Sequence, residues 1–307
     1  MLAFWFSGCL TLRPKRSSEQ ETGHARPEKP SRAVADFAEI LEIELKSIDY
    51  KQDSKALNTE MYTNRGVAYM RKKKHKLAVA DFTKALEIDS ELTEGYLNRG
   101  SVYGLIKDYD KAIADFTKAL EIDPELTEGY INRGIAYAKK GEYELAIADY
   151  EEAISLDSKQ AVAYNNRGVA YDHLGQYSLS IKDYSRAIAL NPKYANAYNN
   201  RACAYDFMGR YEEAVSDYTR AIEFNPKNPH MYLGRGVAHY ELGEGEKACR
   251  DWQKGCELGR CKNYNIAIKS NLCKKAQPKP NVFTSMLTRF VDVIVDLDEN
   301  PDDLSYY

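Results

Sequence analysis

Arginine and aspartate recur in step through the middle of the chain, each at a spacing of 34 residues. Most of the arginines follow an asparagine, and an aspartate stands 16 residues after each of them. A guanidinium withdrawn from water needs a carboxylate partner, so the correspondence predicts a ladder of ion pairs rather than a catalytic centre. The residues concerned are Arg65, Asp81, Arg99, Asp115, Arg133, Asp149, Arg167, Asp183, Arg201, Asp217, Arg235 and Asp251.

Two other arrangements of these charges stay open. Each aspartate could pair with the arginine of the following unit, in which case Asp36 would meet Arg65 and Asp251 would be left over. Alternatively, both kinds of side chain could point into solvent and only raise solubility. We favour pairing within one unit, which makes the arginine a structural residue.

The remaining candidates for chemistry do not converge on one site. The stretch from Gly243 to Ala248 imitates a dinucleotide fingerprint, but no strand precedes it, so we expect a turn there. The histidines have no metal-ligand spacing and no nucleophile beside them. They stand at His24, His75, His173, His230 and His239. We therefore expect no enzyme activity, no metal and no cofactor.

Four of the six cysteines lie near the end of the repeated region, at Cys249, Cys256, Cys261 and Cys273. Zinc is not expected, because the chain has no closely spaced cysteine pair of the kind that binds it. Our first interpretation is that these are small core residues. The alternative, for an exported protein, is a disulfide between Cys261 and Cys273 or between Cys256 and Cys261.

The elements that must position these residues follow the same period of 34 residues, which marks a stacked repeat array. Aromatic residues dominate positions 4, 11 and 24 of each unit, and small residues dominate positions 8, 20 and 27. The first three of the positions 4, 8, 11, 20, 24 and 27 share one face of a first helix, and the last three share one face of a second. Counted from position 1, the units are residues 59–92, 93–126, 127–160, 161–194, 195–228 and 229–262.

The turns fit the same scheme. Glycine stands at position 15 in four units, where a left-handed residue can end the first helix, and proline at position 32 can end the second. A helix pair of this size cannot bury its apolar face alone, so neighbouring pairs must stack. The spacing of aromatic, glycine, tyrosine, alanine and proline residues resembles the tetratricopeptide repeat (TPR) family. The resemblance implies an all-α fold, a right-handed TPR superhelix (α-solenoid) of six helix-turn-helix repeats with capping helices at both ends.

The ends of the chain depart from the repeat. Residues 1–31 are expected to be a disordered segment rich in Pro, Ser, Arg and Glu. Residues 32–58 are expected to form an N-terminal capping helix region, a decayed repeat, because residues 33–43 nearly match residues 78–88.

At the other end, residues 263–275 are expected to form a C-terminal capping helix, as solenoid ends require. Residues 276–307 then hold a linker, an amphipathic segment and an acidic tail. The apolar stripe over residues 282–297 could dock in the groove of its own chain, pack on the last repeat or cause self-association. It could also be an ordinary terminal helix.

The resemblance places the functional surface on a concave groove, lined by positions 2, 5, 6, 9, 12 and 13 of the first helices. An amide carries a donor and an acceptor, so a row of asparagines at position 6 can bind the backbone of an extended peptide. The alternative is that these asparagines are framework residues in a wet surface. The candidate contacts are Asn64, Asn98, Asn132, Asn166, Asn200, Asn165, Asn199, His173, Phe207 and Tyr240.

One ligand of the family is excluded by the sequence. Some members clamp the C-terminal carboxylate of a chaperone with lysine at position 5 and asparagine at position 9. Here those positions open with Thr63 and Leu97, and with Val67 and Ser101, so we expect no such clamp.

Composition and charge bound the remaining possibilities. The net charge of -3 does not indicate a nucleic-acid partner, and no apolar run is long enough to span a bilayer. The residues around Cys9 faintly resemble a bacterial lipoprotein cleavage box, although no positive residue precedes them. A cytoplasmic location is favoured, with an exported protein lipid-anchored through Cys9 as the alternative. We expect a non-catalytic scaffold that binds a protein or peptide of unknown identity.

Overall fold

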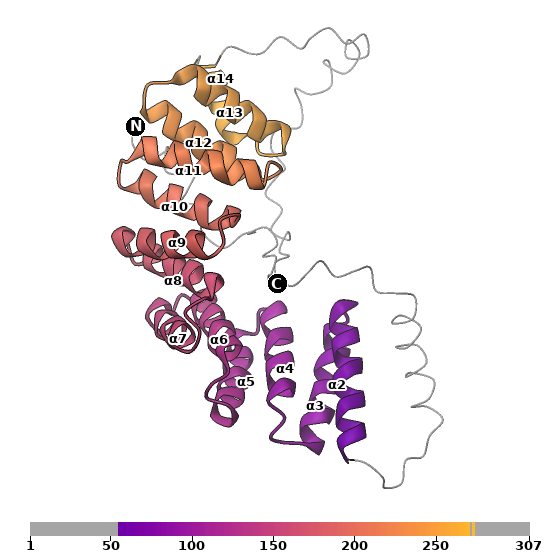
Figure 1. Ribbon diagram of the computed structural model, residues 1–307. Helices are drawn as coiled ribbons and strands as arrows, with labels where there is room; N and C mark the ends of the chain where they lie inside the picture. Colours follow the sequence, from indigo (N-terminus) through magenta and orange to yellow (C-terminus); the bar gives the residue numbers. More distant parts are fainter. Residues whose placement is uncertain (1–54, 271, 274–307) are drawn as a thin grey trace, which may run out of the picture. The chain divides into compact units, whose positions relative to one another are not determined.

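The computed structural model describes residues 55–270, 272 and 273, and this part of the chain is built from α-helices without strands (Figure 1). The expected segments 1–31 and 276–307, and most of the expected N-terminal cap, lie outside the described residues. The helices are α2 (Lys55–Arg71), α3 (His75–Ile88), α4 (Thr93–Leu105), α5 (Tyr109–Ile122), α6 (Thr127–Lys140), α7 (Tyr143–Leu156), α8 (Ala161–His173), α9 (Tyr177–Leu190), α10 (Ala195–Phe207), α11 (Tyr211–Phe224), α12 (Pro229–Glu241), α13 (Gly245–Glu257) and α14 (Lys262–Lys269).

Each unit is a hairpin of two antiparallel helices. Gly141 closes α6 with a φ of 86°, a left-handed conformation that glycine adopts without strain. The same position is filled by Lys107 after α4, with a φ of 65°, so a lysine takes the left-handed turn there. Across this short turn, the first and second helices of each unit pack against each other.

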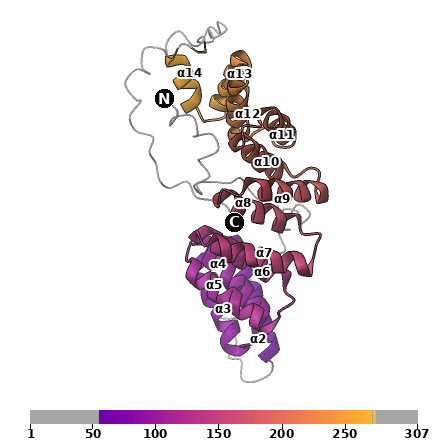
Figure 2. The ribbon, with the colours of Figure 1, turned by 90° about the vertical axis from the view of Figure 1, so that its left-hand side faces the viewer.

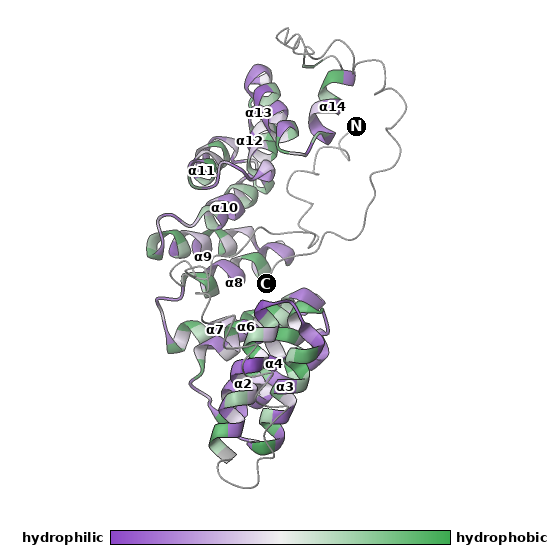
Figure 3. Ribbon diagram, turned by 90° about the vertical axis from the view of Figure 1, so that its right-hand side faces the viewer, coloured by the Kyte–Doolittle hydropathy of each residue, from purple (hydrophilic) through white to green (hydrophobic). Residues whose placement is uncertain are grey.

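The core of each hairpin pairs a glycine or alanine with a large ring. A Cβ atom on Gly134 would lie 2.7 Å from Cε1 of Tyr150, so only a residue without a side chain allows this approach of α6 to α7. Tyr150 is 1 % exposed as a result. Hydrophobic and hydrophilic stretches alternate along the helices in Figure 3, as expected where one face of each helix packs and the other meets water.

The helices form two compact bodies, α2–α9 and α10–α14. In the first body the second helix of each unit packs on the first helix of the next, in the pairs α3 with α4, α5 with α6 and α7 with α8. The first helices also contact one another directly, α2 with α4, α4 with α6 and α6 with α8, and so form a continuous inner layer. In the second body α10 contacts α12 and α11 packs on α12 in the same manner (Figure 2).

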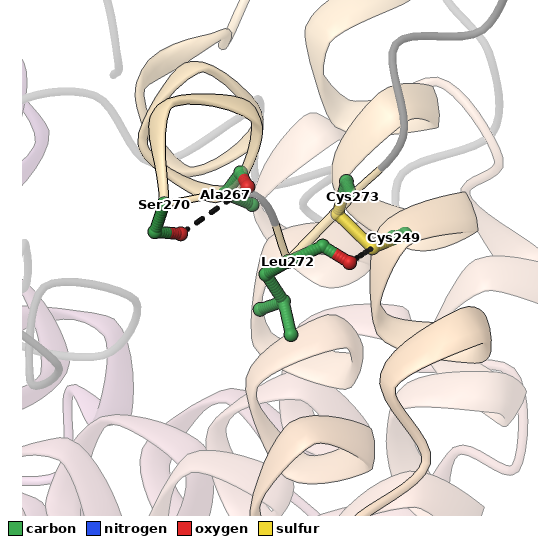
Figure 4. Close-up of a disulfide and its surroundings, with 5 residues drawn as sticks. All are labelled: Cys249, Ala267, Ser270, Leu272 and Cys273. Atoms are coloured by element: carbon green, nitrogen blue, oxygen red, sulfur yellow. Dashed lines mark hydrogen bonds between the residues drawn. A yellow bond between two sulfur atoms is a disulfide. The ribbon is translucent and has the colours of Figure 1, made fainter.

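The C-terminal cap differs from the expected one. Helix α14 ends at Lys269, and the backbone N–H groups of Leu272 and Cys273 both donate to the carbonyl oxygen of Ala267. The chain therefore turns back toward α13 instead of continuing as a helix to residue 275. Figure 4 shows the result, in which Cys273 lies against Cys249 of α13.

Two disulfides staple this cap, so the interpretation of the four cysteines as simple core residues is wrong. Cys249 is bonded to Cys273, with 5.6 Å between their Cα atoms, and Cys256 is bonded to Cys261. The second pair is one of the two expected alternatives. The other alternative, Cys261 with Cys273, is wrong because the turn after α14 brings Cys273 to the middle of α13, whereas Cys261 stays beside the end of that helix.

Candidate binding face of the first helices

Each repeated arginine is paired with the aspartate of its own unit. The Nε and Nη2 atoms of Arg133 donate to the two carboxylate oxygens of Asp149, at 2.9 and 2.7 Å. The same bidentate geometry joins the other five pairs, at 2.6–2.9 Å. The aspartate side chains are 7–9 % exposed and the arginines 17–20 %. Such parallel, charge-assisted bonds are among the strongest that proteins use.

The arginines also connect one unit to the next. Nη1 of Arg99 donates to Oγ1 of Thr83 at 3.1 Å, and Nη1 of Arg133 donates to Oγ1 of Thr117 at 3.1 Å. In the second body, Arg235 makes the equivalent bond to Thr219 at 3.0 Å. One guanidinium therefore ties the two helices of its own unit and the second helix of the preceding unit together.

Tyrosine rings complete the surroundings of the guanidinium groups. Arg133 lies 5.6 Å from the centroid of the Tyr130 ring, and the tyrosine at position 4 of every other unit makes the same contact at 5.5–5.8 Å. The hydrogen bonds from Asp149 raise the pKa of Arg133 above its ordinary value. The arginine is thus charged, paired on three sides and occupied by the framework.

Position 12, which belongs to the expected groove, has a different role in two units. The hydroxyl group of Tyr184 donates to Oδ2 of Asp172 at 2.6 Å, and that of Tyr218 donates to Oδ2 of Asp206 at 2.8 Å. Burial raises the pKa of Asp172 to about 6. Both carboxylates accept hydrogen bonds from rings of the hairpin core, so they are committed to the fold.

The amide row at position 6 is uneven in the first body. Asn64 is exposed and Asn132 is half-buried, and the side chains of these two residues make no hydrogen bonds to the described part of the chain. Asn98 donates to Oε1 of Glu94 on its own helix at 3.3 Å. Asn165 and Asn166 are buried, at 3 and 8 % exposure, and bonded to each other at 3.3 Å. Free amides therefore stand at Asn64 and Asn132.

Between these amides the face is apolar, and its two edges differ in charge. Leu97, Ile131, Ile135 and Val169 are half-buried at positions 5 and 9. One edge is formed by position 2, at the start of each first helix, where three glutamates are exposed: Glu60, Glu94 and Glu128. The opposite edge is formed by position 13, where the first body carries Arg71, Leu105, Lys139 and His173.

A hollow of about 610 Å³ opens at the acidic edge, between α2 and the start of α4. The residues that line it come from positions 1, 2, 5 and 6 of the first unit and from the following turn. They are Ala56, Thr59, Glu60, Thr63, Asn64, Asp89, Leu92 and Glu94. The expected groove positions thus surround a real depression at this end of the face.

His173 lies at the basic edge and is exposed, with its ring stacked on that of Tyr143. In the second body, Asn199 donates to Oδ1 of Asn200 at 3.4 Å. Phe207 is half-buried at the end of α10. Tyr240 packs on Trp252 at 5.9 Å between ring centroids and belongs to the edge of the core, so its ring has a packing role.

The described residues contain no group of three or more histidine, cysteine or acidic side chains that could hold a metal ion. His239 is buried and contacts Glu244 through Nδ1, which places it among structural groups. Within the same residues no helix has the length and apolar character needed to cross a membrane.

A chain of stacked helical hairpins, with one face formed by the first helices, defines an α-solenoid scaffold. The tetratricopeptide repeat family model matches residues 59–92, 93–126, 127–160, 161–194 and 195–228. The protein therefore belongs to the tetratricopeptide repeat family, whose fold typically serves as a non-catalytic scaffold for protein or peptide partners. A search of curated protein sequences found no match.

Solved structures show the same fold. A tetratricopeptide repeat protein from Parabacteroides merdae ATCC 43184 is 24 % identical, with a TM-score of 0.60 over 78 % of this chain and 91 % of that one. PilW, described as a type IV pilus biogenesis factor, is 21 % identical, with a TM-score of 0.63 over 68 % and 98 %. YrrB, described as a TPR protein with an unusual peptide-binding site, is 24 % identical, with a TM-score of 0.51 over 62 % and 97 %.

Proposed function

We propose that the face formed by the first helices binds an extended peptide segment of a partner protein. The observation that carries the proposal is the free amide of Asn132, which lies in the same strip as the half-buried side chains of Ile131 and Ile135. An amide without a partner can pair with one peptide group of a ligand, and the apolar side chains can cover the adjacent side chains of that ligand. This combination fits a peptide better than a small polar metabolite.

The arginine beside Asn132 takes no part in this binding. Its three arms are occupied by Asp149 and Thr117, so a ligand would have to break bonds of the framework to reach it. The binding role therefore falls on the asparagine at position 6 and the apolar residues at positions 5 and 9, while Asn165 and Asn166 are withdrawn from solvent.

The experiment is a selection followed by mapping. A phage library of random dodecapeptides is panned over the immobilised full-length chain, and the enriched peptides are synthesised with blocked ends. Hydrogen exchange of the chain is then measured with and without peptide. Slower exchange in α4 and α6, with α5 and α7 unchanged, supports the proposal. Failure to enrich any peptide, or protection confined to the second helices, overturns it.

The two disulfides favour a second candidate that differs in location: an exported scaffold, lipid-anchored through Cys9, that assists assembly at a bacterial envelope. Stable disulfides form in oxidising compartments and are rare in the cytosol, and two of them close the cap around α14. Mass spectrometry of the protein from its native cells tests this candidate. A mature N-terminus at a diacylated Cys9 supports it, and an unprocessed Met1 in the cytosolic fraction contradicts it.

A further inference from the structure

We propose that Lys139 and His173 form a subsite for a carboxylate side chain, Asp or Glu, of the peptide bound on the first-helix face. The inference rests on the proposed function and specifies one part of the ligand. The two residues occupy position 13 of successive units, at the ends of α6 and α8, and these helices contact each other.

The ammonium group of Lys139 has no counter-ion among the described residues. Its neighbour Lys140 is bound to two carboxylates, with Nζ at 2.8 Å from Asp110 and at 2.8 Å from Glu142. Lys139 is half-buried and makes no such bond. Burial lowers the pKa of Lys139, and no nearby acid offsets this effect. Since a half-buried cation is stabilised by an opposite charge, this position is complementary to an anion.

His173 is held in place by a ring of another helix. Tyr143, the first residue of α7, stacks on the imidazole at 4.4 Å between centroids, with 7° between the ring planes. The short turn through Gly141 brings α7 to this place, so the end of α6, the start of α7 and the end of α8 converge. The stack covers one face of the imidazole and leaves its edge, which carries the N–H donor, for a ligand.

The acids around the subsite are engaged elsewhere. Asp172, beside His173 on α8, accepts the hydroxyl group of Tyr184, and Glu142, before α7, is paired with Lys140. The exposed Glu128 stands at the opposite end of α6, one helix length away. Partial burial lowers the pKa of His173, and the positive charge of Lys139 lowers it further. A neutral donor thus stands beside a single positive charge.

This charge selects the ligand. One ammonium and one imidazole N–H match a carboxylate, which carries one negative charge and two acceptor oxygens. Phosphate groups are recognised by clusters of arginine or by several backbone N–H groups, and the position 7 arginines are already occupied. The subsite therefore fits an aspartate or glutamate in the peptide, placed at the edge opposite the three exposed glutamates.

The experiment uses the blocked dodecapeptides enriched on the full-length chain, labelled for fluorescence polarisation. We expect an acidic residue at one fixed position of the consensus, and a loss of about 10-fold in affinity when it is replaced by its amide. Lys139→Met should weaken the acidic peptide by about the same factor and leave the amide peptide unchanged. Lys139→Arg should keep most of the affinity, because it keeps the charge.

The matched control is Lys140→Met, which removes the adjacent lysine that already has two partners and should leave both peptides unaffected. Far-UV circular dichroism of each variant confirms that the repeats are folded. A consensus without an acidic position, or equal weakening of the acidic and amide peptides by Lys139→Met, overturns the subsite and leaves the proposed function standing. Enrichment of no peptide overturns both.

Discussion

Arg133 and Asp149 join the two helices of the third unit through two parallel hydrogen bonds, and a third bond from Arg133 reaches Thr117 of the preceding unit. Stacking of helical hairpins is usually attributed to apolar contact alone. Here a charged group forms part of the packing between units, and it repeats at position 7 throughout the array. Its removal should therefore loosen the repeat and leave the binding face in place.

The first prediction concerns this pair. Arg133→Leu leaves Asp149 buried without its cation, and we expect the free energy of unfolding to fall by about 3 kcal/mol. Arg133→Leu combined with Asp149→Leu should recover most of that loss, because no unpaired charge remains. Urea unfolding followed by circular dichroism measures both.

A control on an exposed pair sets the scale. The side chains of Lys118 and Glu121 are 50 and 58 % exposed, so Glu121→Gln should change the same free energy by less than about 0.5 kcal/mol. If Arg133→Leu has an equally small effect, the pair is a surface contact and our account of the stacking is incorrect.

The second prediction concerns pH. The pKa of Asp172 is about 6 in the folded protein, above its ordinary value of 3.8. The folded state therefore binds more protons than the unfolded state between these values, so stability is highest at low pH and falls as pH rises through about 6. The contribution amounts to about 3 kcal/mol, from a shift of about two pKa units.

Asp172→Asn keeps the shape of the side chain and removes the titration. We expect the difference in unfolding free energy between wild type and this variant to change by about 2–3 kcal/mol in favour of the variant between pH 4.5 and pH 7.5. A difference that stays constant over this range would show that Asp172 has an ordinary pKa.

The third prediction concerns the cap. Digestion of the protein without reduction should yield peptides that link Cys249 to Cys273 and Cys256 to Cys261. Cys273→Ser opens a loop of 24 residues and should lower the stability of the cap by about 3 kcal/mol, measured by hydrogen exchange in α13 and α14. Recovery of a Cys261–Cys273 peptide would contradict the structure.

The sequence predicted much of the fold, because the repeat samples the same physics six times. The arginine and aspartate could be matched because both recur at fixed positions, and the glycine opposite each core ring follows from the same period. The order of helices needed no further information.

The parts that the sequence did not predict are those that break the period. Asp172 and Asp206 were placed in the groove, although both units that carry them have tyrosine at position 24, whereas Phe82 and Phe116 occupy that position in the first two units. That difference between units was an available signal for buried hydrogen bonds. The return of the chain after α14 and the burial of Asn165 had no periodic counterpart.

The measurement that most directly tests the account compares Asn132 with its neighbour Arg133 in one peptide-binding assay. We predict that Asn132→Ala weakens an enriched dodecapeptide by about 10-fold without changing stability, since it removes a hydrogen bond to the ligand. The double variant Arg133→Leu and Asp149→Leu should keep wild-type affinity. Wild-type affinity in Asn132→Ala, together with loss of binding in the folded double variant, would contradict the account.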